Sequence, residues 1–227
     1  MEVMAGDVMI VEFFDYNCPY CRLVRETLTE LALDADIYPC PKGGKRFRSE
    51  VLELGGKAQF PFLVDDNTGA NLYESVDIIE YLYTTYGKRS VPLRVKAALP
   101  QAVSSLANSA LGLGAGTKVR ASKKPEQMLT LYGFEASPFC RPVREVLCEL
   151  EIPYHLVNLG KEQFADMGVN GVHAAVGEYN PVKGGKREQF MAKTNKMMVP
   201  YLEDPNTGKA MFESKAIVEY LLETYGG

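Results

Sequence analysis

The 227-residue sequence has few of the features that mark several large classes of protein. It contains only five cysteines, and so odd and sparse a set argues against a secreted domain held together by disulfides. Residues 1–9 lack the basic start and the apolar core of a signal peptide, although a transit peptide already removed would leave no trace. The net charge of −4 argues against a general nucleic-acid binder.

The composition is that of an ordinary soluble globular protein, with 46% apolar and 24% charged residues. Disorder would need fewer apolar residues and a larger net charge. A chain of this length suits two compact units of about 80–100 residues each.

Charge is distributed unevenly along the chain. The stretch between Gly87 and Glu126 has no acidic residue and a charge of +8, so the rest of the chain sums to −12. We interpret this stretch as a basic linker between two acidic bodies. Its basic residues are Lys88, Arg89, Arg94, Lys96, Lys118, Arg120, Lys123 and Lys124.

The two halves of the chain repeat the same motifs in the same order, which indicates a duplication. The matching pairs are Asn17–Arg22 with Ala136–Arg141, Lys42–Arg46 with Lys183–Arg187, Pro61–Gly69 with Pro200–Gly208, Glu74–Ser75 with Glu213–Ser214, and Ile78–Gly87 with Ile217–Gly226. Six of nine residues are identical in the third pair, and seven of ten in the last.

The second copy is longer than the first. Cys21 and Pro61 are 40 residues apart, whereas Cys140 and Pro200 are 60 residues apart. We place the 20-residue insertion within Lys161–Val182 and expect an irregular excursion or a short extra helix there.

Each copy shows the element order β-α-β-α-β-β-α. Apolar runs predict strands, and apolar residues at helical spacing after each Cys-containing turn predict a helix. A last helix ends at Gly87 or Gly226. The predicted strands include Met9–Phe14, Asp36–Cys40, Met128–Tyr132 and Tyr154–Val157.

This layout resembles the glutaredoxin and glutathione-transferase N-terminal-domain superfamily, and in its tandem form plastid proteins of plants and algae. The resemblance covers almost all the chain except Lys88–Pro125. It implies an α/β fold of two tandem thioredoxin-like domains, residues 7–87 and 127–227, joined by a partly helical basic linker, residues 88–126. It also implies a chloroplast location.

The motif Cys18-Pro19-Tyr20-Cys21 carries the redox chemistry that we expect of the first copy. A cysteine at a helix start has its thiolate favoured by the helix dipole, which lowers the pKa of the thiol. Cys18 is then the nucleophile that attacks a disulfide, and Cys21 the resolving thiol. The alternative is a buried or zinc-bound pair, but zinc needs about four ligands and only Cys40 is an obvious third.

The charges around this motif act in opposite directions. Arg22 and Arg25 favour the thiolate. Glutaredoxins usually have a lysine shortly before the motif, whereas this chain has Glu12 and Asp15, whose charges oppose a thiolate.

The second copy has Ser137-Pro138-Phe139-Cys140 in place of the dithiol. Ser137 stands where the nucleophile was, and Cys140 keeps the resolving position. Two interpretations stay open: a non-catalytic partner domain, or a serine that donates a hydrogen bond to a bound glutathione thiolate, as the resemblance to SPF-type plant transferases implies. Cys148, about 12 Å along the helix from Cys140, is expected in the core.

The resemblance also implies a glutathione site in each copy. A cis-proline presents backbone groups to the glutathione peptide, and the Glu-Ser pair at a helix start holds its γ-glutamyl end; helix capping is the plainer interpretation of that pair. The implied contacts are Tyr20, Phe60, Pro61, Glu74 and Ser75 in the first copy, and Ser137, Cys140, Val199, Pro200, Glu213 and Ser214 in the second.

The linker contains 21 uncharged residues, Ala97–Thr117. We expect a helix there that packs against both copies through Leu99, Val103, Leu106 and Ala110. A membrane contact is the alternative, and many polar residues and glycines argue against a membrane span.

We therefore expect a glutathione-linked thiol–disulfide oxidoreductase that acts on disulfides of unknown protein substrates, binds no nucleic acid and needs no metal. The alternatives are a non-catalytic glutathione-binding or scaffold protein, a glutathione transferase, and an iron–sulfur carrier with glutathione as co-ligand. The sequence shows no all-helical second domain of the transferase kind after either copy, which argues against ordinary transferase activity. We expect His155 and His173 to have structural roles or to lie on the surface.

Overall fold

The computed structural model describes residues 10–14, 18–98, 116, 118–166 and 179–227. The first repeat consists of β1 (Ile10–Phe14), α1 (Pro19–Glu30), β2 (Ala35–Pro39), α2 (Arg48–Gly55), β3 (Phe62–Asp65), β4 (Ala70–Tyr73) and α3 (Ser75–Thr85). The second consists of β5 (Leu129–Gly133), α6 (Cys140–Glu149), β6 (Tyr154–Asn158), α7 (Lys186–Thr194), β7 (Tyr201–Asp204), β8 (Lys209–Phe212) and α8 (Ser214–Tyr225). Both repeats follow the predicted element order.

All eight of these strands belong to one sheet, in the order β4-β3-β1-β2-β6-β5-β7-β8. Within each repeat the first two strands of the chain order are parallel, β1 with β2 and β5 with β6, and the other pairs are antiparallel. The repeats meet where β2 pairs with β6 in antiparallel fashion, with Ala35 opposite Leu156 and Ile37 opposite Tyr154. Shared sheet hydrogen bonds therefore join the repeats, a contact that the sequence did not predict.

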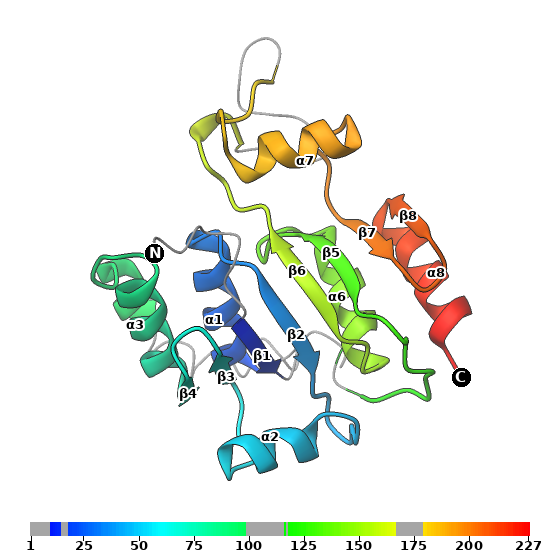
Figure 1. Cartoon of the computed structure of the whole chain (residues 1–227), viewed down its shortest axis with the longest axis horizontal. Helices are drawn as coiled ribbons and strands as arrows, with labels where there is room; N and C mark the ends of the chain where they lie inside the picture. The colour runs from blue at the N-terminus through cyan, green and yellow to red at the C-terminus, as the bar shows by residue number, and fades with distance from the viewer. Residues whose placement is uncertain (1–9, 15–17, 99–115, 117, 167–178) are drawn as a thin grey trace.

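Helices cover both faces of this sheet. On one face, α1, α3, α6 and α8 enclose a single hydrophobic core to which both repeats contribute (Figure 1). On the other face, α2 covers a smaller cluster of Cys40, Phe47, Val51 and Phe62. At the matching place in the second repeat, Phe190 of α7 lies among the rings of Tyr132, Tyr201 and Phe212.

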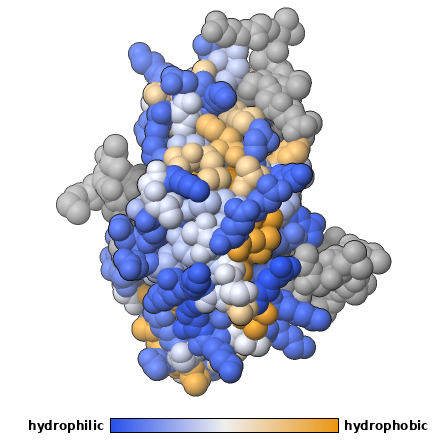
Figure 2. All heavy atoms as spheres, turned by 90° about the vertical axis from the view of Figure 1, so that its right-hand side faces the viewer, coloured by the Kyte–Doolittle hydropathy of each residue, from blue (hydrophilic) through white to orange (hydrophobic). Residues whose placement is uncertain are grey.

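The two ends of the sheet are formed by β4 and β8. The side of the molecule that carries β8 and α8 presents mostly hydrophilic residues around a hydrophobic band (Figure 2). Lys209 on β8 is exposed, and a charge on an outer strand disfavours pairing with another sheet edge.

A buried aspartate fixes the hairpin turn of each repeat to its last helix. Asp65 accepts hydrogen bonds from the hydroxyls of Tyr81 and Tyr86, at 2.6 and 2.5 Å, and from the backbone N–H of Asn67. Asp204 in the second repeat has the same three kinds of partner. The repeated Asn-Thr-Gly turn therefore serves packing, and its glycine has a φ of about 70° in both copies.

The linker is described in part. It contains a short helix, α4 (Leu93–Ala98), but the predicted stripe of Leu99, Val103, Leu106 and Ala110 lies outside the described residues. Further along, Lys118 forms a β-bridge with Lys42 and Ser122 forms one with Gly226, so the end of the linker contacts both repeats. No helix in the described part of the chain is long and apolar enough to span a membrane.

The insertion in the second repeat is also described in part. It includes a short 3₁₀ turn, η2 (Phe164–Asp166), and residues 167–178, with His173, lie outside the described part. Asp166 accepts hydrogen bonds from Tyr179 and from the backbone N–H groups of Glu162 and Gln163. The predicted domain boundaries at residues 87 and 127 stay predictions.

Candidate functional site

Cys18 lies at the N-terminus of α1. It is the N-cap residue, and its Sγ accepts the backbone N–H of Cys21 at 3.5 Å. Pro19 follows at the first helical position, where its fixed φ suits a helix start and no N–H is needed. Cys18 is half-buried at the edge of the core, whereas Cys21 has no exposed surface. The motif therefore presents one accessible sulfur at the positive end of a helix.

The peptide bond between Phe60 and Pro61 is cis, as the resemblance implied. Phe60 is half-buried and packs against the same core as Cys18. The Arg48 guanidinium lies over its ring, 4.9 Å from the centroid. Pro61 directly precedes β3, which pairs with the β1 strand that leads into the Cys18 turn.

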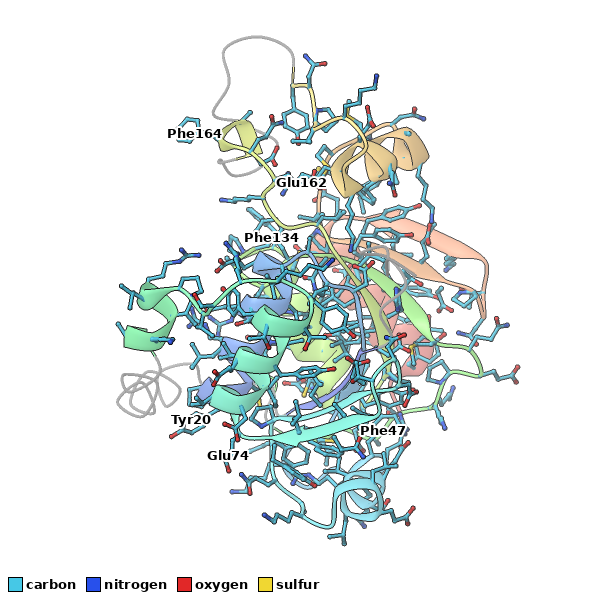
Figure 3. All side chains as sticks on the ribbon, turned by 60° about the vertical axis from the view of Figure 1, so that its left-hand side comes forward. Tyr20, Phe47, Glu74, Phe134, Glu162 and Phe164 are labelled. Carbon is cyan, nitrogen blue, oxygen red and sulfur yellow. The ribbon has the colours of Figure 1, made fainter. Side chains whose placement is uncertain are left out.

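Glu74 and Ser75 begin α3. Glu74 is exposed and has a φ of 63°, in the left-handed region that residues other than glycine rarely adopt. Its carboxylate accepts a hydrogen bond from the Gln59 side chain, next to the cis-proline segment. Tyr20 and Glu74 lie at the same end of the first repeat (Figure 3). The first repeat thus brings a carboxylate and a helix start to the end that carries the dithiol turn.

The second repeat copies this backbone with different chemistry. The Val199–Pro200 peptide bond is cis, and Glu213, before Ser214, has a φ of 72°. Ser137 Oγ accepts the Cys140 backbone N–H at 3.3 Å, as Cys18 Sγ does for Cys21.

Burial distinguishes the second turn from the first. Ser137 is only 3% exposed and Cys140 is not exposed at all, so a ligand sulfur would reach either side chain only if the turn opened. Burial also raises the pKa of the Cys140 thiol, because it disfavours the thiolate. Gly133 leaves the room that this thiol needs, since a Cβ at residue 133 would lie 2.8 Å from Cys140 Sγ.

The remaining cysteines, Cys40 and Cys148, and His155 are not part of either turn. Cys40 and Cys148 are fully buried in the core, and Cys40 Sγ is 3.6 Å from the Tyr38 carbonyl. His155 is paired across the junction of the repeats with Asp36, at 2.7 Å. Among the described residues, no group of His, Cys, Asp and Glu side chains is placed to hold a metal ion.

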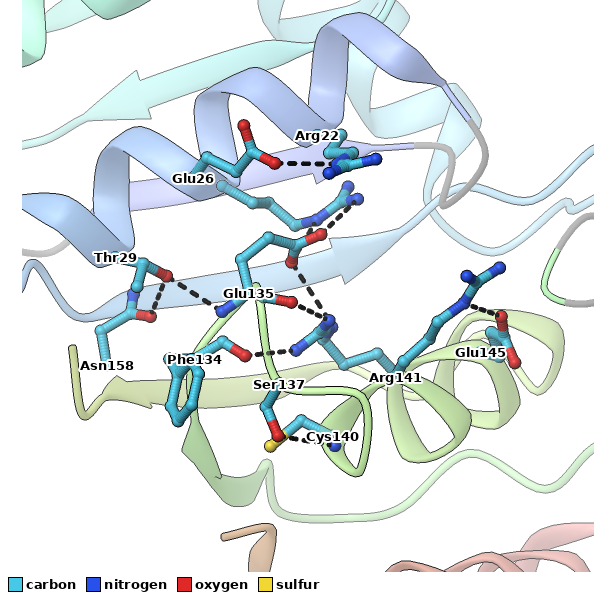
Figure 4. Close-up of polar contacts among 12 residues, drawn as sticks. Arg22, Glu26, Thr29, Phe134, Glu135, Ser137, Cys140, Arg141, Glu145 and Asn158 are labelled. Carbon is cyan, nitrogen blue, oxygen red and sulfur yellow. Dashed lines mark hydrogen bonds and ion pairs between the residues drawn. The ribbon is translucent and has the colours of Figure 1, made fainter. Parts of the chain in front are cut away.

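A buried ion network between the repeats was not foreseen from the sequence. Glu135, just before the Ser137 turn, binds Arg25 of α1 through both carboxylate oxygens, at 3.0 and 3.2 Å. The same carboxylate lies 3.3 Å from Arg144 of α6 (Figure 4). Burial alone would raise the pKa of the Glu135 carboxyl, but the two guanidinium groups outweigh it and hold the pKa below 4.5. The sequence pointed to this network only through a Val-Arg-Glu segment that occurs in both copies and contains Arg25 and Arg144.

The repeated Lys-Gly-Gly-Lys-Arg segments form a reciprocal clamp. Arg46 of the first repeat donates to the Glu151 carbonyl, beyond the end of α6, at 2.7 Å. Lys186 of the second repeat donates to the Ala32 carbonyl, beyond the end of α1, at 2.6 Å. Cations stabilise the carbonyl groups at helix C-termini, so each segment caps the first helix of the other repeat.

The fold and this paired arrangement define a protein of two thioredoxin-like units. The model of the glutathione S-transferase N-terminal domain matches residues 13–90 and 131–227, and the chain belongs to that family. A curated relative, the Escherichia coli K12 glutathione S-transferase GstB, is 33% identical over 99 residues, which are 44% of this chain and 38% of the relative. The chain therefore matches about two fifths of the length of that relative.

Solved glutathione transferases resemble parts of the chain. A Bombyx mori enzyme is 27% identical, with a TM-score of 0.32, over 36% of this chain and 37% of its own. A Phanerochaete chrysosporium enzyme, solved with oxidized glutathione, is 25% identical, with a TM-score of 0.33, over 37% of this chain and 40% of its own.

Proposed function

We propose that the first repeat is a glutathione-linked thiol–disulfide oxidoreductase with Cys18 as its nucleophile. The observation that carries this proposal is the half-buried Cys18 sulfur at the start of α1, hydrogen-bonded to a backbone N–H, beside a fully buried Cys21. A helix N-terminus stabilises a thiolate, which is the reactive form. The family match supports glutathione as the co-substrate.

The proposed reaction starts from a protein with a glutathione mixed disulfide. The Cys18 thiolate attacks the glutathione sulfur, a Cys18–glutathione disulfide forms, and the protein thiolate leaves and takes up a proton. A second glutathione thiolate then attacks the bound glutathione sulfur, which yields oxidised glutathione and restores the Cys18 thiolate. For a protein disulfide, the Cys18 thiolate attacks one sulfur, which forms a Cys18–protein mixed disulfide and releases the other protein thiolate to take up a proton. Cys21 then attacks the Cys18 sulfur of this mixed disulfide, releases the second protein thiol and leaves a Cys18–Cys21 disulfide. Two glutathione molecules reduce that disulfide and become oxidised glutathione.

The glutathione molecule would lie between the Cys18 turn, the cis-proline segment and the start of α3. Backbone groups of Phe60 would pair with its peptide, as an added strand does. The side chain of Glu74 would bind the α-ammonium group, and the N–H groups at the start of α3 would bind the adjacent carboxylate. The Ser75 side chain is only 4% exposed, so it would join this contact only if the segment moved on binding. Tyr20 and Pro61 would line the pocket.

We propose that the second repeat is not catalytic, because it has a serine where the first repeat has the half-buried Cys18 and because it buries Ser137 and Cys140. Its cis Val199–Pro200 bond and its Glu213–Ser214 pair repeat the binding elements, so glutathione binding without turnover stays a proposal for this repeat.

Substitution of Cys18 and, separately, of Cys140 tests this division of labour between the repeats. Cys18→Ser is expected to abolish glutathione-coupled reduction of a small mixed disulfide, while Cys140→Ser keeps most of the rate. Circular dichroism of both variants controls for misfolding. Equal losses from the two substitutions would refute the specialisation of the repeats.

Glutathione transfer to an electrophile is the second candidate, and the family match favours it. An assay that joins glutathione to an aromatic electrophile measures this transfer activity directly. The Cys18→Ser variant separates the two activities, since it should lose the disulfide activity whether or not it keeps the transfer activity. The chloroplast location is a further proposal, to be tested by imaging a fluorescent fusion of the full gene product.

A further inference from the structure

The ion network between the repeats adjoins the helix of the proposed nucleophile. Glu135 of the second repeat holds Arg25 with two hydrogen bonds, and the Arg25 side chain is 2% exposed. Thr29, one turn further along α1, accepts the Glu135 backbone N–H at 3.2 Å. The segment that leads to the Ser137 turn is thereby fixed to α1 (Figure 4).

We propose that Glu135 is a positioning residue of the second repeat that sets the acidity of the Cys18 thiol by anchoring and partly neutralising Arg25. This inference rests on the proposed function of Cys18. It gives the repeat without a nucleophile a regulatory role at the site of the other repeat.

The geometry of α1 relates Arg25 to the thiol. Arg25 follows Cys18 by seven residues, which is close to two helical turns, so both lie on the same side of the helix. Long helical side chains point back toward the N-terminus, which brings the guanidinium closer to Cys18 than its Cα. Its positive charge favours a thiolate, and the Glu135 carboxylate opposes that effect.

Other charges in this region bear on the same thiol. Arg22 lies one turn from Cys18, and Glu26 pairs with it at 2.8 Å. Arg144 shares the Glu135 carboxylate from the other side. The titratable and charged groups that face this network include Arg22, Arg25 and Glu26 on α1, Glu135 before α6, Cys140, Arg144 and Cys148 on α6, and Tyr154 on β6.

The test measures the rate of Cys18 alkylation by iodoacetamide against pH in the full chain. In Glu135→Gln the midpoint should fall by about 0.5 pH unit, because a carboxylate is lost and Arg25 keeps its charge. In Arg25→Gln the midpoint should rise by a similar amount. Shifts of the midpoint in opposite directions indicate an electrostatic effect, because damage to the fold would not shift the midpoint down in one variant and up in the other.

Glu203→Gln is the matched control, since it removes a carboxylate of β7 in the second repeat, which pairs with Lys193 of α7 away from the junction. Its midpoint should equal that of the unaltered protein. If Glu135→Gln fails to fold, the Arg25→Gln variant still tests the inference, because in that variant Glu135 retains its ion pair with Arg144. Midpoints unchanged in the folded variants would overturn the inference, whereas an unreactive Cys18 in the unaltered protein would overturn the proposed function instead.

Discussion

Cys18 and Ser137 hold the same place in the two repeats, and each accepts the backbone N–H three residues ahead through its side chain. Capping therefore survives the exchange of sulfur for oxygen, while redox chemistry does not. The sequence alone located both residues, because the turn and its spacing are duplicated. It did not reveal that Ser137 is buried, since exposure depends on packing between segments far apart in the chain.

A residue-scale prediction concerns the start of α3. Glu74→Ala with Ser75→Ala should weaken glutathione binding by about 1–3 kcal/mol, because charged hydrogen bonds to the γ-glutamyl end are lost. Isothermal calorimetry measures this directly. Glu80→Ala, an exposed change on the same helix, should leave the affinity unaltered. Unchanged affinity in the double variant would reduce the Glu-Ser pair to helix capping.

At the scale of elements, local sequence patterns predict the strands and helices. They do not predict the junction between the repeats, where β2 pairs with β6. The alternation of buried residues in β2 and β6 predicts strands but does not say which edge meets which. Glu135, which binds Arg25, and Glu151, which binds Arg46, each lie more than a hundred residues away in the sequence. The periodicity of apolar residues does not indicate contacts between such distant residues. From the sequence we therefore expected the linker to set the orientation of the repeats.

The pairing of β2 with β6 should make stability depend on pH. The hydrogen bond that His155 Nδ1–H donates to Asp36 raises the pKa of His155 above 6.5, so the stabilisation by this pair is complete below that pH and is lost as the pH rises through the raised value. The pair is partly exposed, so the effect should stay below about 1 kcal/mol. Urea unfolding near pH 6 and near pH 9 tests this, and His155→Asn should remove most of the difference. An equal pH dependence in both proteins would contradict it.

At the scale of the molecule, one sheet and one main core run through both repeats. Shared burial couples the folding of the parts it joins, so we expect a single cooperative transition in calorimetry. Leu156→Ala on β6 should lower the stability of that whole transition by about 2–5 kcal/mol, because it opens a cavity in the shared core. Leu54→Ala, at a half-exposed site on α2, is the control. Two separate transitions would show that the repeats fold independently.

The central claim is that Cys18, alone among the five cysteines, exchanges disulfides with glutathione. The most direct measurement treats the reduced full chain with oxidised glutathione and maps the adduct by mass spectrometry. We predict either one glutathione per chain, attached at Cys18, or a Cys18–Cys21 disulfide whose formation has released that glutathione, with Cys40, Cys140 and Cys148 unmodified. No change at Cys18, or modification of Cys140 at a comparable rate, would contradict the account.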